Sequence, residues 1–166
     1  MRPRRRPPPV AVGPRERLLA DAVADGAHLG GTRDAFYAAV PGEPAPLRVA
    51  WEDVQAADWD ADASTLTVTE VGSWGVPRPR HAFVLREPGR LLELVRERVT
   101  ASVVLQRQVA VAGGRGLRVI GRRAPGGAGP VRWLYEFDEG VDPADPAVLA
   151  VAREALAAAQ AEVGPV

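Results

Sequence analysis

The stretch that decides the fold class is Arg90–Val111, RLLELVRERVTASVVLQRQVAV, because the spacing of its apolar residues changes after Thr100. Before that point apolar residues recur at the spacing of an amphipathic helix: Leu91, Leu92, Val95 and Val99. After it they alternate with polar residues, as in a strand with one buried face: Val103, Leu105, Val109 and Val111. Arg107 is the exception on the apolar side of this strand. A helix followed directly by a strand predicts an α+β fold.

The sequence before this stretch predicts a meandering antiparallel sheet. Short apolar runs are separated by turn residues about every ten positions. The runs are Arg17–Ala24, Ala27–Thr32, Ala35–Val40, Leu47–Ala50, Val54–Asp58, Leu66–Val71 and His81–Arg86. Between the first two, Asp25-Gly26 is a typical hairpin turn.

The sequence after it predicts more strands and a closing helix. A glycine-rich turn, Gly113–Gly116, leads into Leu117–Arg123, and the loop Ala124–Pro130 leads into Val131–Asp138, the clearest strand of the chain. The final helix has Asp145 as its N-cap, Pro146 at its first position and Gly164 at its C-terminal cap. Its apolar stripe must lie on a sheet.

Residues 1–14, MRPRRRPPPVAVGP, are too rich in Pro and Arg to pack, so we expect a disordered arm followed by a single domain over 15–166. The arm runs into prolines rather than an apolar segment, so it is not a secretory signal. No stretch has the roughly 20 apolar residues of a membrane span. These features favour the cytosol.

The composition excludes several chemistries. All 21 basic residues are arginine, and lysine, cysteine and asparagine are absent, a bias typical of a GC-rich, actinobacterial genome. Without cysteine there are no disulfides, thiolate nucleophiles or cysteine-ligated clusters. Without lysine there is no Schiff base and no phosphate-loop lysine. We therefore expect no cofactor.

Two groups of residues suggest metal or catalytic sites. Asp58, Asp60 and Asp62 have the alternation of a calcium loop, but Ala63 stands where that loop needs glycine and Thr69 where it needs a bidentate acid, so a solvated hairpin turn is favoured. The imidazoles, His28 and His81, would need to converge with acids such as Asp34 or Glu52 to form a catalytic site. Neither Ser64, Ser73 nor Ser102 stands in a nucleophile elbow.

Three further patterns have a structural and a functional interpretation. Gly113, Gly114 and Gly116 favour a hairpin turn over an anion-binding loop. Tryptophans at sheet edges usually close a core, which favours a core role over ligand stacking for Trp51, Trp59 and Trp74. By strand alternation, Arg118, Arg122 and Arg132 share the solvent face of one hairpin. Together with Arg2, Arg4, Arg5 and Arg6 they form a candidate anion-binding or partner-binding surface, although arginine is also the chain's only cation for solubility.

The region from Glu16 to Asp60 resembles the bacterial PH-like and GRAM-like domains. The matching pieces are Glu16–Ala20, Leu29–Thr32 with Phe36 and Tyr37, and Trp51–Val54 before Ala56–Asp58. The resemblance implies a PH-like antiparallel β-barrel or roll of about seven or more strands, with one inserted helix at Arg90–Val99 and a capping C-terminal helix. It also implies binding rather than catalysis. Members that bind phosphoinositides carry basic residues in the first loop, where this chain has Asp25-Gly26.

The preferred hypothesis is therefore a non-enzymatic binding or adaptor module that takes a protein or peptide partner at a sheet edge or a helix-flanking groove. A second hypothesis is electrostatic attachment to an anionic membrane, or less favourably to nucleic acid, through the Arg-rich arm and hairpin. A third and less favoured one is a hydrolase built from His and Asp alone.

Overall fold

The protein, seen in a computed structural model, divides into two compact units, residues 1–100 and 101–166. The structure describes residues 9–72 and 76–165. Each unit has a hydrophobic core of its own, and the two cores share no residue. The division into two compact units lies within the predicted domain over 15–166, which stays a prediction. The apolar pattern of the sequence predicts which face of each element is buried, but it does not predict which elements pack against one another.

The first unit begins with a four-stranded antiparallel meander in the order β1-β2-β3-β4. The strands are β1 (Ala20–Ala24), β2 (Ala27–Gly31), β3 (Ala35–Ala39) and β4 (Leu47–Ala50). The predicted Asp25-Gly26 hairpin turn is confirmed, since Ala24 pairs with Ala27 and Gly26 has a φ of +74°. A left-handed backbone of this kind favours glycine.

A second sheet of three antiparallel strands follows after the short 3-10 helix η1 (Trp51–Asp53), in the order β5-β6-β7. Its strands are β5 (Val54–Asp60), β6 (Thr65–Glu70) and β7 (Arg80–Val84). Among the described residues a single antiparallel bridge, Ala24 with Leu85, links β1 to the end of β7. The sheets are not closed into a barrel, so that part of the prediction is not confirmed.

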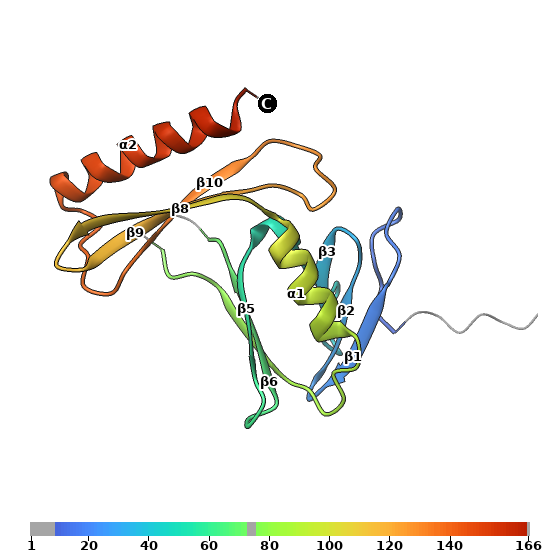
Figure 1. Cartoon of the computed structure of the whole chain (residues 1–166). Coiled ribbons are helices and arrows are strands. Elements are labelled where there is room, and N and C mark those ends of the chain that lie inside the picture. The colour runs from blue at the N-terminus through green and yellow to red at the C-terminus, as the bar shows by residue number, and fades with distance from the viewer. Residues whose placement is uncertain (1–8, 73–75, 166) are drawn as a thin grey trace, which may run out of the picture. The chain divides into compact units, whose positions relative to one another are not determined.

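The helix α1 (Leu91–Ala101) packs on both sheets of the first unit (Figure 1). Leu91 and Val95 are buried and belong to the same core as Leu29 of β2 and Leu66 of β6. Trp51 is fully buried beneath them, and its indole N–H donates to the Thr32 carbonyl over 3.0 Å. The predicted core role of Trp51 is confirmed.

The segment before β1 packs on the outer face of the first sheet. Val10 is fully buried against Ala35 and Tyr37, and the main-chain N–H of Gly13 donates to the Tyr37 hydroxyl over 3.1 Å. The arm predicted over residues 1–14 is therefore packed from Val10 onward, because its valines find an apolar surface on β3. Residues 1–8 lie outside the described residues.

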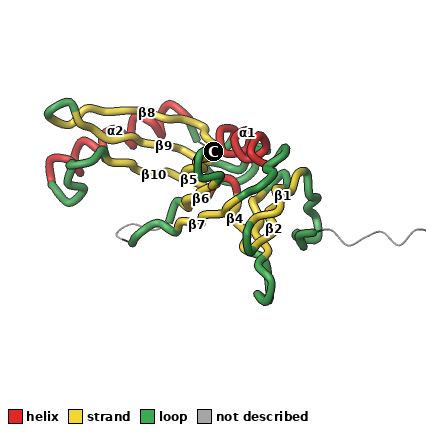
Figure 2. Tube along the Cα trace, turned by 90° about the horizontal axis from the view of Figure 1, so that it is seen from below, coloured by secondary structure: helices red, strands yellow, loops and turns green. Residues whose placement is uncertain are grey.

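The second unit is a three-stranded antiparallel sheet with a helix on one face (Figure 2). Its elements are β8 (Val103–Ala112), β9 (Arg115–Arg122), β10 (Arg132–Phe137) and α2 (Pro146–Val163). The predicted cap of α2 is confirmed, because the Asp145 carboxylate accepts from the Ala147 N–H over 2.8 Å. Arg107, the charged exception on the apolar face of β8, pairs with Glu162 of α2.

The two helices have different roles from those that the resemblance implied. α2 packs on β8 and β9 of its own unit through Val148, Ala152 and Ala159. The helix that packs on the first seven strands is α1. An amphipathic stripe shows that one face is buried, but it does not identify the sheet beneath it. Of the helices that the structure describes, none is long and apolar enough to cross a membrane.

Candidate functional site

β1 is an edge strand, because within the described chain it pairs along its length with β2 alone. Main-chain groups of a strand point alternately to its two sides. The Asp25 N–H at the end of β1 donates to the Val84 carbonyl over 2.9 Å, on the side away from β2. Because the register of β1 with β2 has no bulge, Asp21 and Val23 direct their N–H and C=O groups to that same side.

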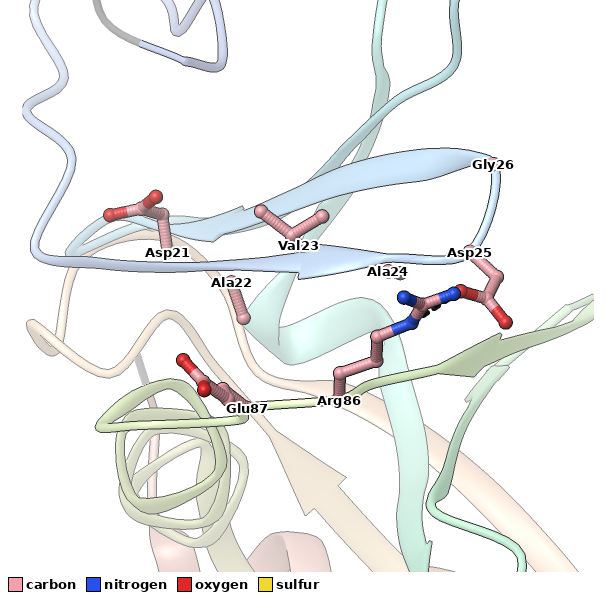
Figure 3. A pocket seen from close by; sticks show the side chains of 8 residues that line it. All are labelled: Asp21, Ala22, Val23, Ala24, Asp25, Gly26, Arg86 and Glu87. Carbon is pink, nitrogen blue, oxygen red and sulfur yellow. Dashed lines mark ion pairs between the residues drawn. The ribbon is translucent and has the colours of Figure 1, made fainter.

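An open groove of about 630 Å³ runs along this edge (Figure 3). Its lining comes from β1, its hairpin turn and the segment after β7: Asp21, Ala22, Val23, Ala24, Asp25, Gly26, Arg86 and Glu87. In Figure 3, Asp21 and Val23 point to one side of β1, while Ala22 points to the side of Glu87. Val23 is 61% exposed, whereas Ala22 and Ala24 are buried in the core.

At the hairpin turn of β1 the two walls of the groove are joined. There the bridge between Ala24 and Leu85 holds the two walls together, and the Arg86 Nε lies 3.3 Å from the Asp25 carboxylate. Toward Asp21 the walls are not bridged. The groove is therefore closed at one end and accessible along β1.

The charges that line the groove are mostly negative. Of the described residues that line it, Asp21, Asp25 and Glu87 have carboxylates and Arg86 has a guanidinium. The Asp21 carboxylate lies 2.8 Å from the His28 imidazole, so Glu87 and the exposed Asp25 are the more available acids. The Arg86–Asp25 pair is exposed, with side-chain exposures of 83% and 55%, and exposed ion pairs of this kind stabilise by about 0.2–1 kcal/mol. A ligand cation can therefore compete with Arg86 for Asp25 without a large penalty.

Behind β1, a hydrogen-bonded cluster fixes the N-terminal segment to the sheet. The Glu16 carboxylate accepts from the Thr32 hydroxyl over 2.7 Å, from the Tyr37 hydroxyl and from the Arg48 Nε over 3.2 Å. Arg48 also donates to the Tyr37 oxygen over 3.0 Å. The cluster joins Glu16 to β2–β4 and so holds the start of β1 in place.

The cluster shifts the titration of its members. Burial alone would raise the pKa of Glu16, but the hydrogen bonds from Tyr37, Thr32 and Arg48 lower it below its usual value of 4.5. Burial and the Glu16 carboxylate raise the pKa of Tyr37. Glu16 therefore stays ionised and Tyr37 stays a donor at neutral pH.

A second, more apolar groove of about 420 Å³ lies between α1 and the β5–β6 hairpin. Trp59 and Leu66 contribute one wall, and Leu92 and Val95 the other. Trp59 is 37% exposed. It is therefore not a buried core residue, and the prediction of a core role is wrong for it. It lies on β5, which extends to Asp60, beyond the predicted end at Asp58. Trp74 lies outside the described residues.

The predicted arginine surface is only partly present. Register places Arg118, Arg122 and Arg132 on one face, since Arg118 is opposite Glu136 and Arg122 is opposite Arg132. Arg118 pairs with Glu136 over 2.6 Å. Arg122 is not on a solvent face: it is 4% exposed, it donates to the Ser102 hydroxyl over 2.7 Å, and burial lowers its pKa. Strand alternation gives the face of a residue but not what covers it. Arg2, Arg4, Arg5 and Arg6 lie outside the described residues.

The histidines do not converge. His28 lies 2.8 Å from Asp21, and His81 lies 2.7 Å from Glu70. Each imidazole has its own carboxylate, and neither pairs with Asp34 or Glu52. The convergence that a His and Asp hydrolase requires is therefore not met by these residues.

The predicted turns are confirmed as turns. Asp60 caps the β5–β6 turn, accepting from the N–H groups of Asp62 and Ala63 at 3.0 Å each. Gly113 and Gly114, with φ of +61° and +75°, form the two-residue turn between β8 and β9. Within the ranges 9–72 and 76–165, no cluster of three or more potential metal-binding side chains exists.

The sequence did not identify β1 as the exposed edge. A signal was present in Ala20–Ala24, ADAVA, where the small alanines alternate with Asp21 and Val23. The alternation shows two faces of different polarity. Only the strand order, however, shows which strand lacks a neighbour.

No family model, characterised protein or solved structure matches this chain. The function must therefore be argued from the geometry of its own residues.

Proposed function

We propose that the first unit is a non-enzymatic peptide-binding module, which takes an extended, basic segment of a protein partner as an added strand along the free edge of β1. The observation that carries the proposal is the groove at this edge, into which Asp21 and Val23 direct main-chain donors and acceptors. In strand addition the main-chain hydrogen bonds supply affinity, and side-chain contacts supply specificity. The carboxylates of Glu87 and of the exposed Asp25 favour a basic segment, whereas Asp21 is already paired with His28.

The arrangement of the first unit supports this role. The first unit consists of a four-stranded meander, a three-stranded meander and a helix, in that order along the chain. This order is compatible with the proposal that the unit is related to the PH-like domains. The PH-like resemblance implies an adaptor that binds peptides or assemblies. The unit holds β1 in place from both sides, through the core under Ala22 and through the Glu16 cluster.

The alternative of attachment to an anionic surface has less support. This alternative depends on the predicted arginine surface of the second unit, in which Arg118 pairs with Glu136 and Arg122 is buried. We therefore favour a peptide over a membrane or nucleic acid as the ligand.

The test is fluorescence anisotropy of a labelled eight-residue peptide of alternating Arg and Val, titrated with the full chain. The variant Val23→Pro removes the outward N–H of β1 at a position where an edge strand tolerates proline. We expect it to weaken binding about tenfold or more, because a main-chain hydrogen bond and the close approach of the strand are both lost. Val23→Ala keeps the N–H and should bind within about threefold of the original chain.

Two peptide controls isolate the main chain and the charge. N-methylation at alternate amides removes the donors that face β1 and should abolish binding, whereas methylation at the other amides should not. A peptide of alternating Glu and Val should not bind. Equal binding by the two methylated peptides, or by the acidic and basic peptides, would contradict strand addition at this acidic edge.

A further inference from the structure

The apolar groove between α1 and the β5–β6 hairpin is a second concave surface of the first unit, of about 420 Å³. Trp59 is the cross-strand partner of Leu66, so the two side chains share one face of the hairpin. Leu66 and Val95 are buried, whereas Trp59 keeps 37% of its surface exposed. The volume and the apolar lining are typical of small-molecule sites, which occupy about 300–1,000 Å³.

Two opposite charges on α1 line the same groove. They belong to Glu93 and Arg96, which are both exposed. Residues three apart on a helix are neighbours, with their Cβ atoms about 5–6 Å from each other. Among the described residues, however, no ion pair or side-chain hydrogen bond includes either of them. Both charges are therefore available to a ligand in the groove.

The lining residues differ in the groups that they bind. An exposed indole such as that of Trp59 stacks on another aromatic ring. The guanidinium of Arg96 suits a carboxylate, which it can bind with two parallel hydrogen bonds, and the carboxylate of Glu93 suits an ammonium group. A free aromatic α-amino acid carries all three complementary groups. An internal residue of a peptide has lost both charges, and a simple acid or amine has only one of them.

We infer that this groove binds a free aromatic α-amino acid. Its ring lies between Trp59 and Leu92, its carboxylate at Arg96 and its ammonium group at Glu93. Because both charged side chains are exposed, each ion pair contributes little, and we expect a Kd of about 1 mM. The two grooves of the first unit share none of their described lining residues. The inference therefore goes beyond the proposed peptide binding and does not rest on it.

Titration of the full chain with L-phenylalanine, followed by NMR, tests where the ligand binds. The indole N–H signal of Trp59, assigned by its loss in the variant Trp59→Phe, should shift together with the amide signals of Leu92 to Arg96. The signals of β1 should not move. Trp59→Phe keeps an aromatic ring and should bind within about threefold of the original chain, whereas Trp59→Ala should bind about tenfold more weakly.

Three analogues of phenylalanine test the recognition of its charges. 3-Phenylpropionate lacks the ammonium group and phenethylamine lacks the carboxylate, so each should bind about three- to fivefold more weakly. N-acetylphenylalaninamide lacks both charges and should bind about tenfold more weakly. L-Leucine keeps both charges but has no ring, and it should also bind more weakly than L-phenylalanine.

Variants of α1 assign each charge to its partner. Arg96→Gln should weaken binding of L-phenylalanine about three- to fivefold and leave binding of phenethylamine, which has no carboxylate, unchanged. Glu93→Gln should weaken L-phenylalanine equally and leave 3-phenylpropionate unchanged. The matched controls are Arg90→Gln and Glu97→Gln, which change exposed residues beside or on the same helix that do not line the groove. They should leave the affinity for every probe unchanged.

Three results would overturn the inference. Equal affinity for L-phenylalanine and its uncharged derivative would mean that the groove takes an aromatic side chain of a peptide instead. Shifts at Val23 of β1 without shifts at Trp59 would place the ligand in the other groove. Absence of any shift at concentrations well above the expected Kd would mean that no such site exists. Binding of the Arg–Val peptide at β1 is measured separately, so its failure and the failure of this site are distinguishable.

Discussion

At the residue scale, the first sheet depends on one nearly buried carboxylate. The Glu16 side chain is 9% exposed and accepts hydrogen bonds from Thr32, Tyr37 and Arg48. Hydrogen bonds to a charged group contribute about 1.5–3 kcal/mol each to stability when the group is buried. Loss of this carboxylate removes the acceptor of the Tyr37 hydroxyl and leaves Arg48 with the Tyr37 oxygen as its remaining partner in the cluster. Glu16 therefore stabilises the segment that leads into β1.

The change Glu16→Gln should lower the free energy of unfolding of the first unit by about 2 kcal/mol at pH 7. The pKa of Glu16 is below 4.5 in the folded chain and near 4.5 in the unfolded chain. Its contribution is therefore fully present above pH 4.5 and is lost as the pH falls through the lower, folded pKa. Urea denaturation, followed by amide exchange in β2 and β3, should show a difference between the chains that shrinks below pH 4.5.

The matched control is Glu43→Gln, which changes an exposed carboxylate in the β3–β4 loop. It should leave stability within about 0.5 kcal/mol of the original at either pH. A Glu16→Gln chain whose deficit does not depend on pH would mean that the carboxylate acts through packing alone.

At the element scale, strands and turns could be predicted from the sequence, whereas their partners could not. β4 begins and ends where its apolar run does, and the Gly113-Gly114 turn follows from the need for a left-handed backbone. These features depend on neighbouring residues. The open edge of β1 and the burial of Arg122 depend on residues distant in the sequence. For that reason a sheet edge could be named as a site, but not the edge that carries the groove.

The β8–β9 hairpin depends on a close approach of two main chains. A Cβ on Gly116 would lie 2.1 Å from the Val109 carbonyl oxygen, which is main chain and cannot rotate away. The change Gly116→Ala should therefore destabilise the second unit by about 2–3 kcal/mol. Thermal unfolding monitored by amide exchange in β8 and β9 measures it. Gln108→Ala, on the exposed side of β8, is the control, and an equal effect of the two changes would contradict the close approach.

At the scale of the whole molecule, the chain consists of two units with separate cores. Leu29 belongs to the core of the first unit and Leu117 to that of the second, and both are fully buried. Truncation of a buried leucine to alanine lowers stability by about 2–5 kcal/mol. Because no core residue is shared, the loss should remain within the unit that carries the change.

Hydrogen exchange of the full chain tests this independence. Leu117→Ala should raise the exchange rates of core amides in β8, β9 and α2, and leave those of β2, β3 and α1 unchanged. Leu29→Ala should have the opposite pattern. If either change raises exchange in both units equally, the chain unfolds as one cooperative body, and the peptide site cannot be assigned to the first unit alone.

The central claim is that the free edge of β1 accepts an added strand, and amide exchange along β1 tests it most directly. The measurement compares the full chain with and without the Arg–Val peptide. The account predicts that the peptide slows exchange at Asp21 and Val23 but not at Ala22 and Ala24, which already face β2. Protection without this alternation, or protection confined to the groove beside Trp59, would contradict it.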